Sequence, residues 1–214
     1  MTRTSINNSL FLASLALQAG LLVLVWLRGY ARRIPSFTLL LFFYPMRSLV
    51  LFVLPRMIGP SDFGVAYREL ALFGLLLQVV VAVEIGWRLW RVSGPFRWGL
   101  LLVPVIAWMG ALILWAALPE RTPLPADRLQ IFCSIAMILL CGFALAGRAD
   151  LLLRRVITGL ASFGLVDLIA TAGKSFAALH RDAASFAAWS YVDAGGYLLV
   201  VIFWMLSLRN EQTA

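Results

Sequence analysis

The chain has 214 residues, of which 62% are hydrophobic and only 13% are charged, and its mean hydropathy is +0.92. Soluble domains contain about 45–50% apolar and about 25% charged residues, so this composition excludes a water-soluble fold. The net charge of +8 comes from arginines that lie between apolar runs, which is the pattern of membrane loops rather than of a nucleic-acid-binding surface.

Seven apolar runs follow one another along the chain, and prolines or glycines separate most of them. One bilayer crossing needs about 20 mostly apolar residues. The first run, residues 10–27, is longer than the roughly 7–15 residues of a signal-peptide core, so we expect it to be a retained helix. We predict an all-α, polytopic transmembrane bundle of seven helices in a single transmembrane domain, residues 1–214, with helices at about 9–30, 35–57, 63–91, 96–118, 127–147, 151–179 and 184–208.

The distribution of arginine between alternate loops predicts the orientation of this bundle. If the N-terminus is outside, the cytoplasmic loops carry Arg28, Arg32, Arg33, Arg88, Arg91, Arg97, Arg148, Arg154, Arg155 and Arg209. The outer loops then carry Arg3, Arg56, Arg68, Arg121, Arg128 and Arg181. Because Lys and Arg accumulate on the cytoplasmic side, we predict that the N-terminus is outside and the C-terminus inside.

Five charged residues interrupt the apolar runs: Arg47, Glu84, Asp167, Lys174 and Asp193. A charge at the centre of a membrane helix costs about 2.5–3.5 kcal/mol, so such groups usually face the protein interior and pair. We expect Arg47 to lie within salt-bridge distance of Asp167 or Asp193. Glu84 has a nearer candidate in Arg88, one helical turn away.

Helical spacing groups the polar residues into stripes. The sixth predicted helix carries Gly164, Asp167, Thr171 and Lys174 at intervals of three and four residues. The seventh carries Ser190, Asp193 and Tyr197 beside Gly195 and Gly196, a pair that we expect to let another helix approach closely. These stripes predict an outward-facing ligand or ion pocket between the second, third, sixth and seventh helices, lined by Arg47, Gln78, Asp167, Thr171, Lys174, Asp193 and Tyr197. The alternative is that the charges are architectural and only fix which helices pack together.

Enzyme signatures are absent from the sequence. It contains no H-E-x-x-H, G-x-S-x-G or glycine-rich phosphate loop, and its only histidine, His180, excludes a bis-histidine haem. Cys133 and Cys141 are eight positions apart, about 12 Å on one helix, which is too far for a disulfide. We therefore expect no catalytic residue, no metal site and no cofactor. Asp167 and Asp193 lack the glycine-rich motif of intramembrane aspartyl proteases, and the seventh helix lacks the lysine that retinal proteins carry there.

The whole chain resembles a group of small, uncharacterised seven-helix bacterial membrane proteins. The resemblance is carried by Arg32, Arg33, Pro35 and Phe37 before and within the second predicted helix, by Tyr67, Arg68 and Glu84 on the third, and by Trp189, Tyr191 and Asp193 on the seventh. It implies a multi-pass location in the plasma (inner) membrane. It implies no particular activity.

These features together favour a non-enzymatic integral membrane protein, either sensor-like or a subunit of a membrane assembly, with a polar cluster on the second, sixth and seventh predicted helices. The alternative is a small transporter or an ion or proton pathway that uses Arg47, Asp167, Asp193 and Lys174. Membrane lipid is the expected partner, another membrane protein is a further candidate, and nucleic acid is not expected.

Overall fold

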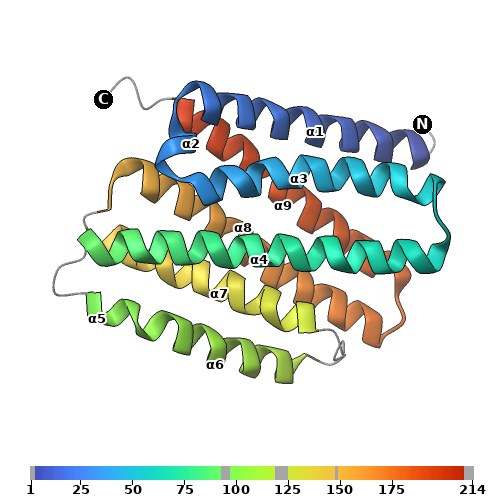
Figure 1. Cartoon of the computed structure of the whole chain (residues 1–214). Coiled ribbons are helices and arrows are strands. Elements are labelled where there is room, and N and C mark those ends of the chain that lie inside the picture. Colours follow the sequence, from blue (N-terminus) through green and yellow to red (C-terminus); the bar gives the residue numbers. More distant parts are fainter. Residues whose placement is uncertain (1–2, 93–96, 119–124, 148, 210–214) are drawn as a thin grey trace. The chain divides into compact units, whose positions relative to one another are not determined.

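A computed structural model describes residues 3–92, 97–118, 125–147 and 149–209 (Figure 1). This part of the chain is 92% helical and contains no strand. The predicted turn at 93–95 and the loop at 119–124 lie outside the described residues. The all-α fold class is therefore confirmed for the described part of the chain.

The described helices follow the apolar runs. They are α1 (Arg3–Leu27), α2 (Tyr30–Arg33), α3 (Pro35–Val53), the 3₁₀ turn η1 (Leu54–Arg56), α4 (Pro60–Val92), α5 (Arg97–Leu100), α6 (Leu102–Ala117), α7 (Pro125–Ala146), α8 (Leu151–Leu179) and α9 (Ala183–Arg209).

Six spans are long and apolar enough to cross a membrane: Pro35–Arg56, Ser61–Val92, Trp98–Ala117, Leu129–Ala146, Leu151–Leu179 and Ala183–Arg209. Phe11–Leu27 adds a shorter apolar helical stretch. Because several such helices occur in one chain, this is a multi-pass helical membrane protein.

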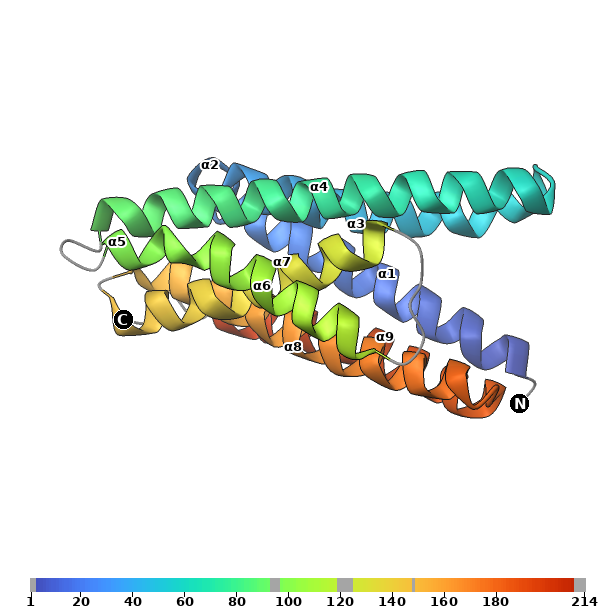
Figure 2. The same ribbon diagram turned by 90° about the horizontal axis from the view of Figure 1, so that it is seen from below.

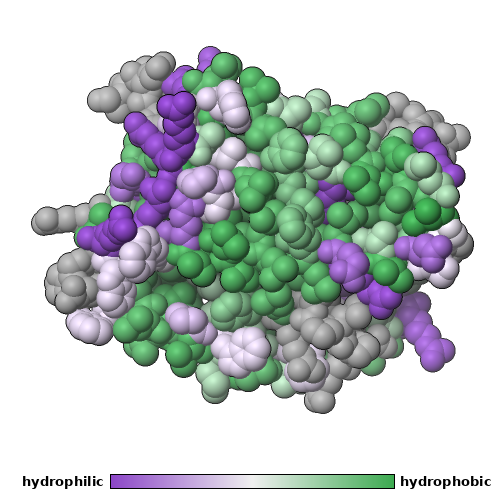
Figure 3. All heavy atoms as spheres, in the orientation of Figure 1, coloured by the Kyte–Doolittle hydropathy of each residue, from purple (hydrophilic) through white to green (hydrophobic). Residues whose placement is uncertain are grey.

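The surface of the molecule supports the same conclusion. Most side chains visible in Figure 3 are hydrophobic. Large apolar side chains are widely exposed; Leu199 on α9, for example, is 69% exposed. Soluble monomers rarely expose contiguous apolar patches of more than a few hundred Å², so lipid is the solvent that suits this surface.

Local sequence signals explain where several helices begin and end. Gly29 separates α1 from α2 with a φ of 68°, a left-handed conformation that glycine adopts without strain. Pro35 occupies the first turn of α3, where a missing N–H leaves no bond unmade. Asp150 caps α8 by accepting a 2.7 Å hydrogen bond from the Leu153 N–H.

The apolar span Trp98–Ala117 is interrupted near its start. Leu101 separates α5 from α6, and its N–H bonds to the Trp98 carbonyl three residues back. Pro104 follows closely and cannot donate a hydrogen bond to the carbonyl of Leu100. The break is therefore a local consequence of the proline, and the apolar span continues from Trp98 to Ala117.

The chain divides into two compact units, which we describe separately. The first comprises Met1–Val81 with Met205–Ala214, and the second comprises Ala82–Trp204. In the first unit α1 packs against α3, and the rings of Phe11 and Phe52 stack at 4.8 Å. Arg28 and Tyr30 donate hydrogen bonds to the carbonyls of Arg209 and Leu208, so the end of α9 is capped from the α1–α2 turn.

In the second unit α7 packs against both α6 and α8 (Figure 2). Glycines allow these contacts. A Cβ on Gly110 of α6 would lie 3.2 Å from the Ile135 side chain, and one on Gly164 of α8 would lie 3.1 Å from the backbone of Ser134. α7 therefore comes very near the backbone of α8 at Ser134, and this contact positions the polar site.

Candidate functional site

The site begins with a tight, antiparallel contact between α8 and α9. Three glycines on these helices each face a bulky side chain of the other helix, and a Cβ on any of them would come within 2.2–2.3 Å of that side chain. The pairs are Gly159 with Trp204, Val166 with Gly196, and Gly173 with Trp189. The three α8 positions are spaced by two helical turns, so they form one face that α9 covers.

Gly195 and Gly196 were both predicted to permit a close helix approach. The prediction is confirmed for Gly196, which faces Val166, and is wrong for Gly195, where an added Cβ would meet nothing within 4 Å. Successive residues on a helix point about 100° apart, so only one of two adjacent glycines can face α8.

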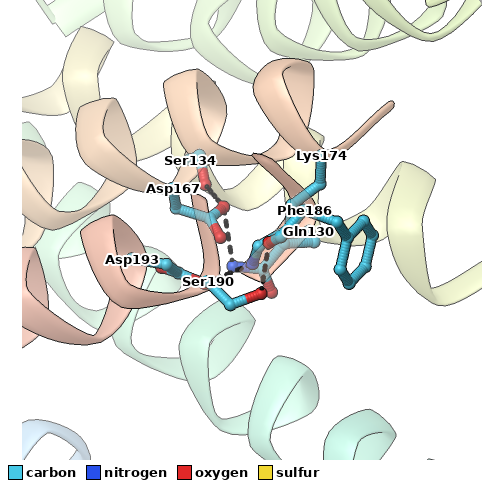
Figure 4. Close-up of polar contacts among 7 residues, drawn as sticks. All are labelled: Gln130, Ser134, Asp167, Lys174, Phe186, Ser190 and Asp193. Atoms are coloured by element: carbon cyan, nitrogen blue, oxygen red, sulfur yellow. Dashed lines mark hydrogen bonds and ion pairs between the residues drawn. The ribbon is translucent and has the colours of Figure 1, made fainter. Parts of the chain in front are cut away.

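An ion pair joins the same two helices. Lys174 Nζ on α8 lies 2.7 Å from Asp193 Oδ2 on α9 (Figure 4). Side chains lean toward the N-terminus of their own helix. Because α8 and α9 run in opposite directions, Lys174 and Asp193 lean toward each other. The pair is only partly enclosed, with 26% of the lysine side chain and 27% of the aspartate side chain exposed.

Asp167 has different partners, both on α7. Its Oδ2 atom accepts a 2.9 Å hydrogen bond from Gln130 Nε2 and a 3.0 Å hydrogen bond from Ser134 Oγ (Figure 4). Asp167 is buried, with 7% of its surface exposed. Gln130 and Ser134 are one turn apart and therefore share a face of α7.

Lys174 and Asp167 are two helical turns apart on α8, about 10 Å along the helix axis, which is too far for a direct bond. The structure gives each of them a partner on another helix, α9 for Lys174 and α7 for Asp167.

Gln130 and Ser134 were missed by the sequence analysis. Both are polar, four residues apart, and at the start of an apolar span, Leu129–Ala146. That spacing is the signal that could have revealed them, since a polar stripe on an apolar helix usually faces the protein interior. Their pairing with Asp167 depends on the contact at Gly164.

The remaining predicted pocket residues are distributed over both units. In the first unit, Gln78 Nε2 on α4 donates a 2.8 Å hydrogen bond to the Tyr44 hydroxyl on α3, and the Arg47 guanidinium carbon lies 5.7 Å from the centre of the Tyr67 ring.

In the second unit, the Tyr197 ring packs edge-on against Phe163 at 5.5 Å. Thr171 is half-buried, one turn beyond Asp167.

The expected salt bridge from Arg47 to Asp167 or Asp193 would join the two units, because Arg47 belongs to the first and both aspartates to the second. It stays a prediction.

Two features that depend only on spacing along one helix are as predicted: the ion pair of Glu84 and the separation of the two cysteines. Glu84 and Arg88 form the predicted one-turn ion pair, with Arg88 Nη2 2.7 Å from Glu84 Oε1. Cys133 and Cys141 are buried free thiols, as their spacing predicts. Within the described residues, no group of three or more His, Cys, Asp and Glu side chains could hold a metal ion.

The turn between α8 and α9 is held by Asp182. Its carboxylate accepts hydrogen bonds from the Ser185 hydroxyl and from the backbone N–H groups of Ser185 and Ala184. These bonds, above all the one from the Ser185 hydroxyl, hold the pKa of Asp182 below its usual range.

The second unit thus contains a polar network that runs from α7 through α8 to α9 inside apolar spans. It offers one buried carboxylate with neutral donors and one partly exposed ion pair. Such groups can bind a cation, a proton or a polar ligand head group, and they can also fix the register of three helices. No protein-family model, curated protein or solved structure matches this chain.

Proposed function

We propose that this chain is a non-enzymatic protein of the plasma (inner) membrane, sensor-like or a subunit of a membrane assembly, that acts through the polar network of α7, α8 and α9. We further propose seven transmembrane helices with the N-terminus outside and the C-terminus inside. Helix α1 would supply the seventh crossing, since its 25 residues correspond to about 37 Å, more than the roughly 30 Å of bilayer hydrocarbon.

The observation that carries the proposal is the ion pair between Lys174 and Asp193. Both residues lie within apolar spans, and about a quarter of each side chain is exposed. Contact between lipid chains and a charged pair is unfavourable, so a polar environment is needed over this part of the α8–α9 surface. Water, a polar ligand or a polar group of another membrane protein would each supply it.

The depth of the pair favours access from outside. Lys174 lies five residues, or about 8 Å, before the end of α8, and that end faces outward in the proposed orientation. A lysine so near the membrane surface could extend toward the water. It instead points inward to Asp193. A ligand that bound either charge from the outer side would compete with this bond and loosen α9 from α8.

Helix α9 connects this pair to the opposite side of the membrane. It is continuous from Ala183 to Arg209, and its last carbonyls are held by Arg28 and Tyr30. A ligand-dependent change in α9 near Asp193 would therefore reach a fixed point at the proposed cytoplasmic end. This supports a sensor-like role, in which ligand binding on the outer side changes α9 and a partner responds to that change at the cytoplasmic end.

Cysteine labelling tests the outward opening. In a background with Cys133→Ala and Cys141→Ala, we compare Ser190→Cys with Val192→Cys; both positions are exposed and at nearly equal depth on α9, but only Ser190 shares a face with Asp193. A membrane-impermeant methanethiosulfonate added to intact cells should label position 190 and leave 192 unlabelled. Equal labelling of the two positions, or no labelling at 190, contradicts an outward polar opening.

The same reagent class tests the orientation. His180→Cys lies in the exposed turn before α9 and should react in intact cells, whereas Arg32→Cys should react only after the membrane is permeabilised. The reverse pattern would place the N-terminus inside.

A second candidate function, a small transporter or an ion or proton pathway, is favoured by Asp167. This buried carboxylate is bonded to two neutral side chains. Proteoliposomes with a pH-sensitive or sodium-sensitive dye inside would detect transport, which Asp167→Asn should abolish.

A further inference from the structure

The α1–α2 turn and the last turn of α9 meet at one end of the first unit (Figure 1). Their contact consists of the hydrogen bonds from Arg28 Nη2 to the Arg209 carbonyl, at 3.0 Å, and from the Tyr30 hydroxyl to the Leu208 carbonyl, at 3.4 Å. Arg28 and Arg209 are 181 positions apart in the sequence, so only folding brings these segments together. The arginines of this end form a cluster: Arg28, Arg32, Arg33 and Arg209.

The arginine cluster carries an excess of positive charge. Among the described residues of the first unit, the carboxylates are those of Asp62 and Glu69, in the first ten residues of α4, which begins beyond the other end of α3. Glu211, which follows α9 in the sequence, offsets at most one of the four arginine charges. An anion is therefore the group that this end attracts.

The arginine side chains are placed to reach a group outside the chain. Arg32, Arg33 and Arg209 are exposed, and Arg28 is half-buried. A guanidinium carries five N–H groups, and the bond to the α9 carbonyl uses one of those of Arg28. Arg28 can therefore hold the end of α9 and a phosphate oxygen at the same time, since guanidinium groups bind phosphates through several N–H groups.

The residues that precede the arginine cluster suit the remainder of a lipid molecule. Trp26 is 72% exposed and Leu27 is 78% exposed, and they end the apolar helical stretch Phe11–Leu27. Exposed tryptophans of membrane proteins lie at the level of the lipid head groups. A lipid whose acyl chains lie along α1 would therefore have its head group beside the arginines.

We propose that the arginine cluster binds the phosphate group of an anionic phospholipid of the surrounding membrane, with Trp26 at the level of its head group. Clustered arginines beside a membrane helix attract anionic lipids. The same end holds the last carbonyls of α9, so bound lipid should also stabilise the fold. The proposal rests on the location in a membrane, and not on the sensor-like role or on the orientation.

The test is the melting temperature of the purified full chain in dodecyl maltoside, at constant pH and ionic strength, as lipid is added. Phosphatidylglycerol, which carries a net negative charge, is compared with phosphatidylethanolamine of the same acyl chains, which carries none. Phosphatidylglycerol should raise the melting temperature with a saturable dependence on concentration, and phosphatidylethanolamine much less. Inorganic phosphate at the same concentration should have little effect, because it lacks the chains that hold a lipid beside α1.

The variant Arg32→Gln with Arg33→Gln removes two exposed charges and leaves the bond from Arg28 to α9 in place. We expect its apparent affinity for phosphatidylglycerol to fall about thirtyfold, since each arginine near an anionic lipid contributes about fivefold. Arg32→Lys with Arg33→Lys keeps both charges and should retain most of the affinity. Arg32→Gln alone, with a loss of about fivefold, tests the site even where the double variant fails to fold.

The matched control is Arg56→Gln with Arg68→Gln. It removes two exposed arginines from the same unit, on η1 and α4, and so changes the net charge by the same amount. Its affinity for phosphatidylglycerol should be unchanged, because neither residue belongs to the arginine cluster.

Three results would overturn the proposal: equal effects of the two lipids, the same loss of affinity in the control as in the Arg32 and Arg33 variant, or a full effect of inorganic phosphate alone. None of them bears on the labelling of Ser190→Cys, so the proposed function and the lipid site can fail independently.

Discussion

The Glu84–Arg88 and Lys174–Asp193 ion pairs stabilise different levels of the structure. Glu84 and Arg88 lie one turn apart on α4, so their bond is made within a single helix. Lys174 and Asp193 lie on different helices, and their bond exists only because α8 and α9 pack in one particular register. The first pair requires a helix and nothing more, whereas the second requires the tertiary structure.

This difference predicts how the two pairs respond to mutation. A one-turn pair within a single helix contributes little, because the helix forms without that bond. A pair between two helices leaves an uncompensated charge at the helix contact when one member is removed. Contacts between helices should therefore dominate the stability of the second unit, and contacts within helices should be minor.

The largest effect is expected from Asp193→Ala. Removal of this carboxylate leaves the Lys174 ammonium without its partner, and we expect a loss of about 2–3 kcal/mol in the free energy of unfolding, below the usual range for fully buried pairs because this pair is partly exposed. Glu84→Ala should cost only about 0.3–0.5 kcal/mol. Unfolding of detergent-solubilised protein measures both.

The double variant Lys174→Met with Asp193→Leu serves as the control, since it removes both charges. It should recover most of the lost stability. Equal losses in Asp193→Ala and Glu84→Ala would remove the distinction between the two pairs.

Adjacent glycines offer a matched test of the same idea. Gly196→Ala places a Cβ 2.3 Å from Val166 on α8 and should destabilise by about 1–3 kcal/mol. Gly195→Ala meets no neighbour and should stabilise by about 0.5–1 kcal/mol, because alanine favours a helix more than glycine does. Similar melting temperatures for the two variants would show that α8 and α9 do not meet at Gly196.

Trp204 tests a smaller contact between the same helices. Its indole N–H donates a 3.3 Å hydrogen bond to the Val156 carbonyl, and its ring lies over Gly159. Trp204→Phe keeps most of the ring and loses the donor, so we expect a loss of about 1 kcal/mol. Trp26→Phe, at an exposed position, should change stability by less than about 0.5 kcal/mol in the same assay.

The smallest effect should come from the cap at Asp182. Its pKa in the folded protein is below the ordinary value of 3.8, so its contribution to stability is fully present above that value and is lost as the pH falls through the folded pKa. Hydrogen exchange of the Ala184 and Ser185 amides should accelerate relative to the intrinsic rate in that acidic range. In Asp182→Asn, this additional acid dependence should disappear.

Features that depend on composition and on local spacing could be predicted from the sequence. High hydropathy and scarce charge indicate a membrane protein built from apolar helices. Backbone N–H and C=O groups inside a bilayer find no water to bond to, and a helix satisfies them within its own segment. The Glu84–Arg88 pair and the separation of Cys133 from Cys141 follow from 3.6 residues per turn, which holds in any helix.

The partners of the intramembrane charges depend on how the helices pack and could not be predicted from the sequence. Asp167, Lys174 and Asp193 were recognisable as unusual from the sequence, but nothing in their spacing assigned Lys174 to Asp193 or Asp167 to Gln130 and Ser134. These assignments depend on which helix faces which, and on a rotation that brings Gly196 rather than Gly195 against α8. Facing helices are chosen by steric fit between side chains far apart in the sequence, and periodicity along one helix carries no information about that fit.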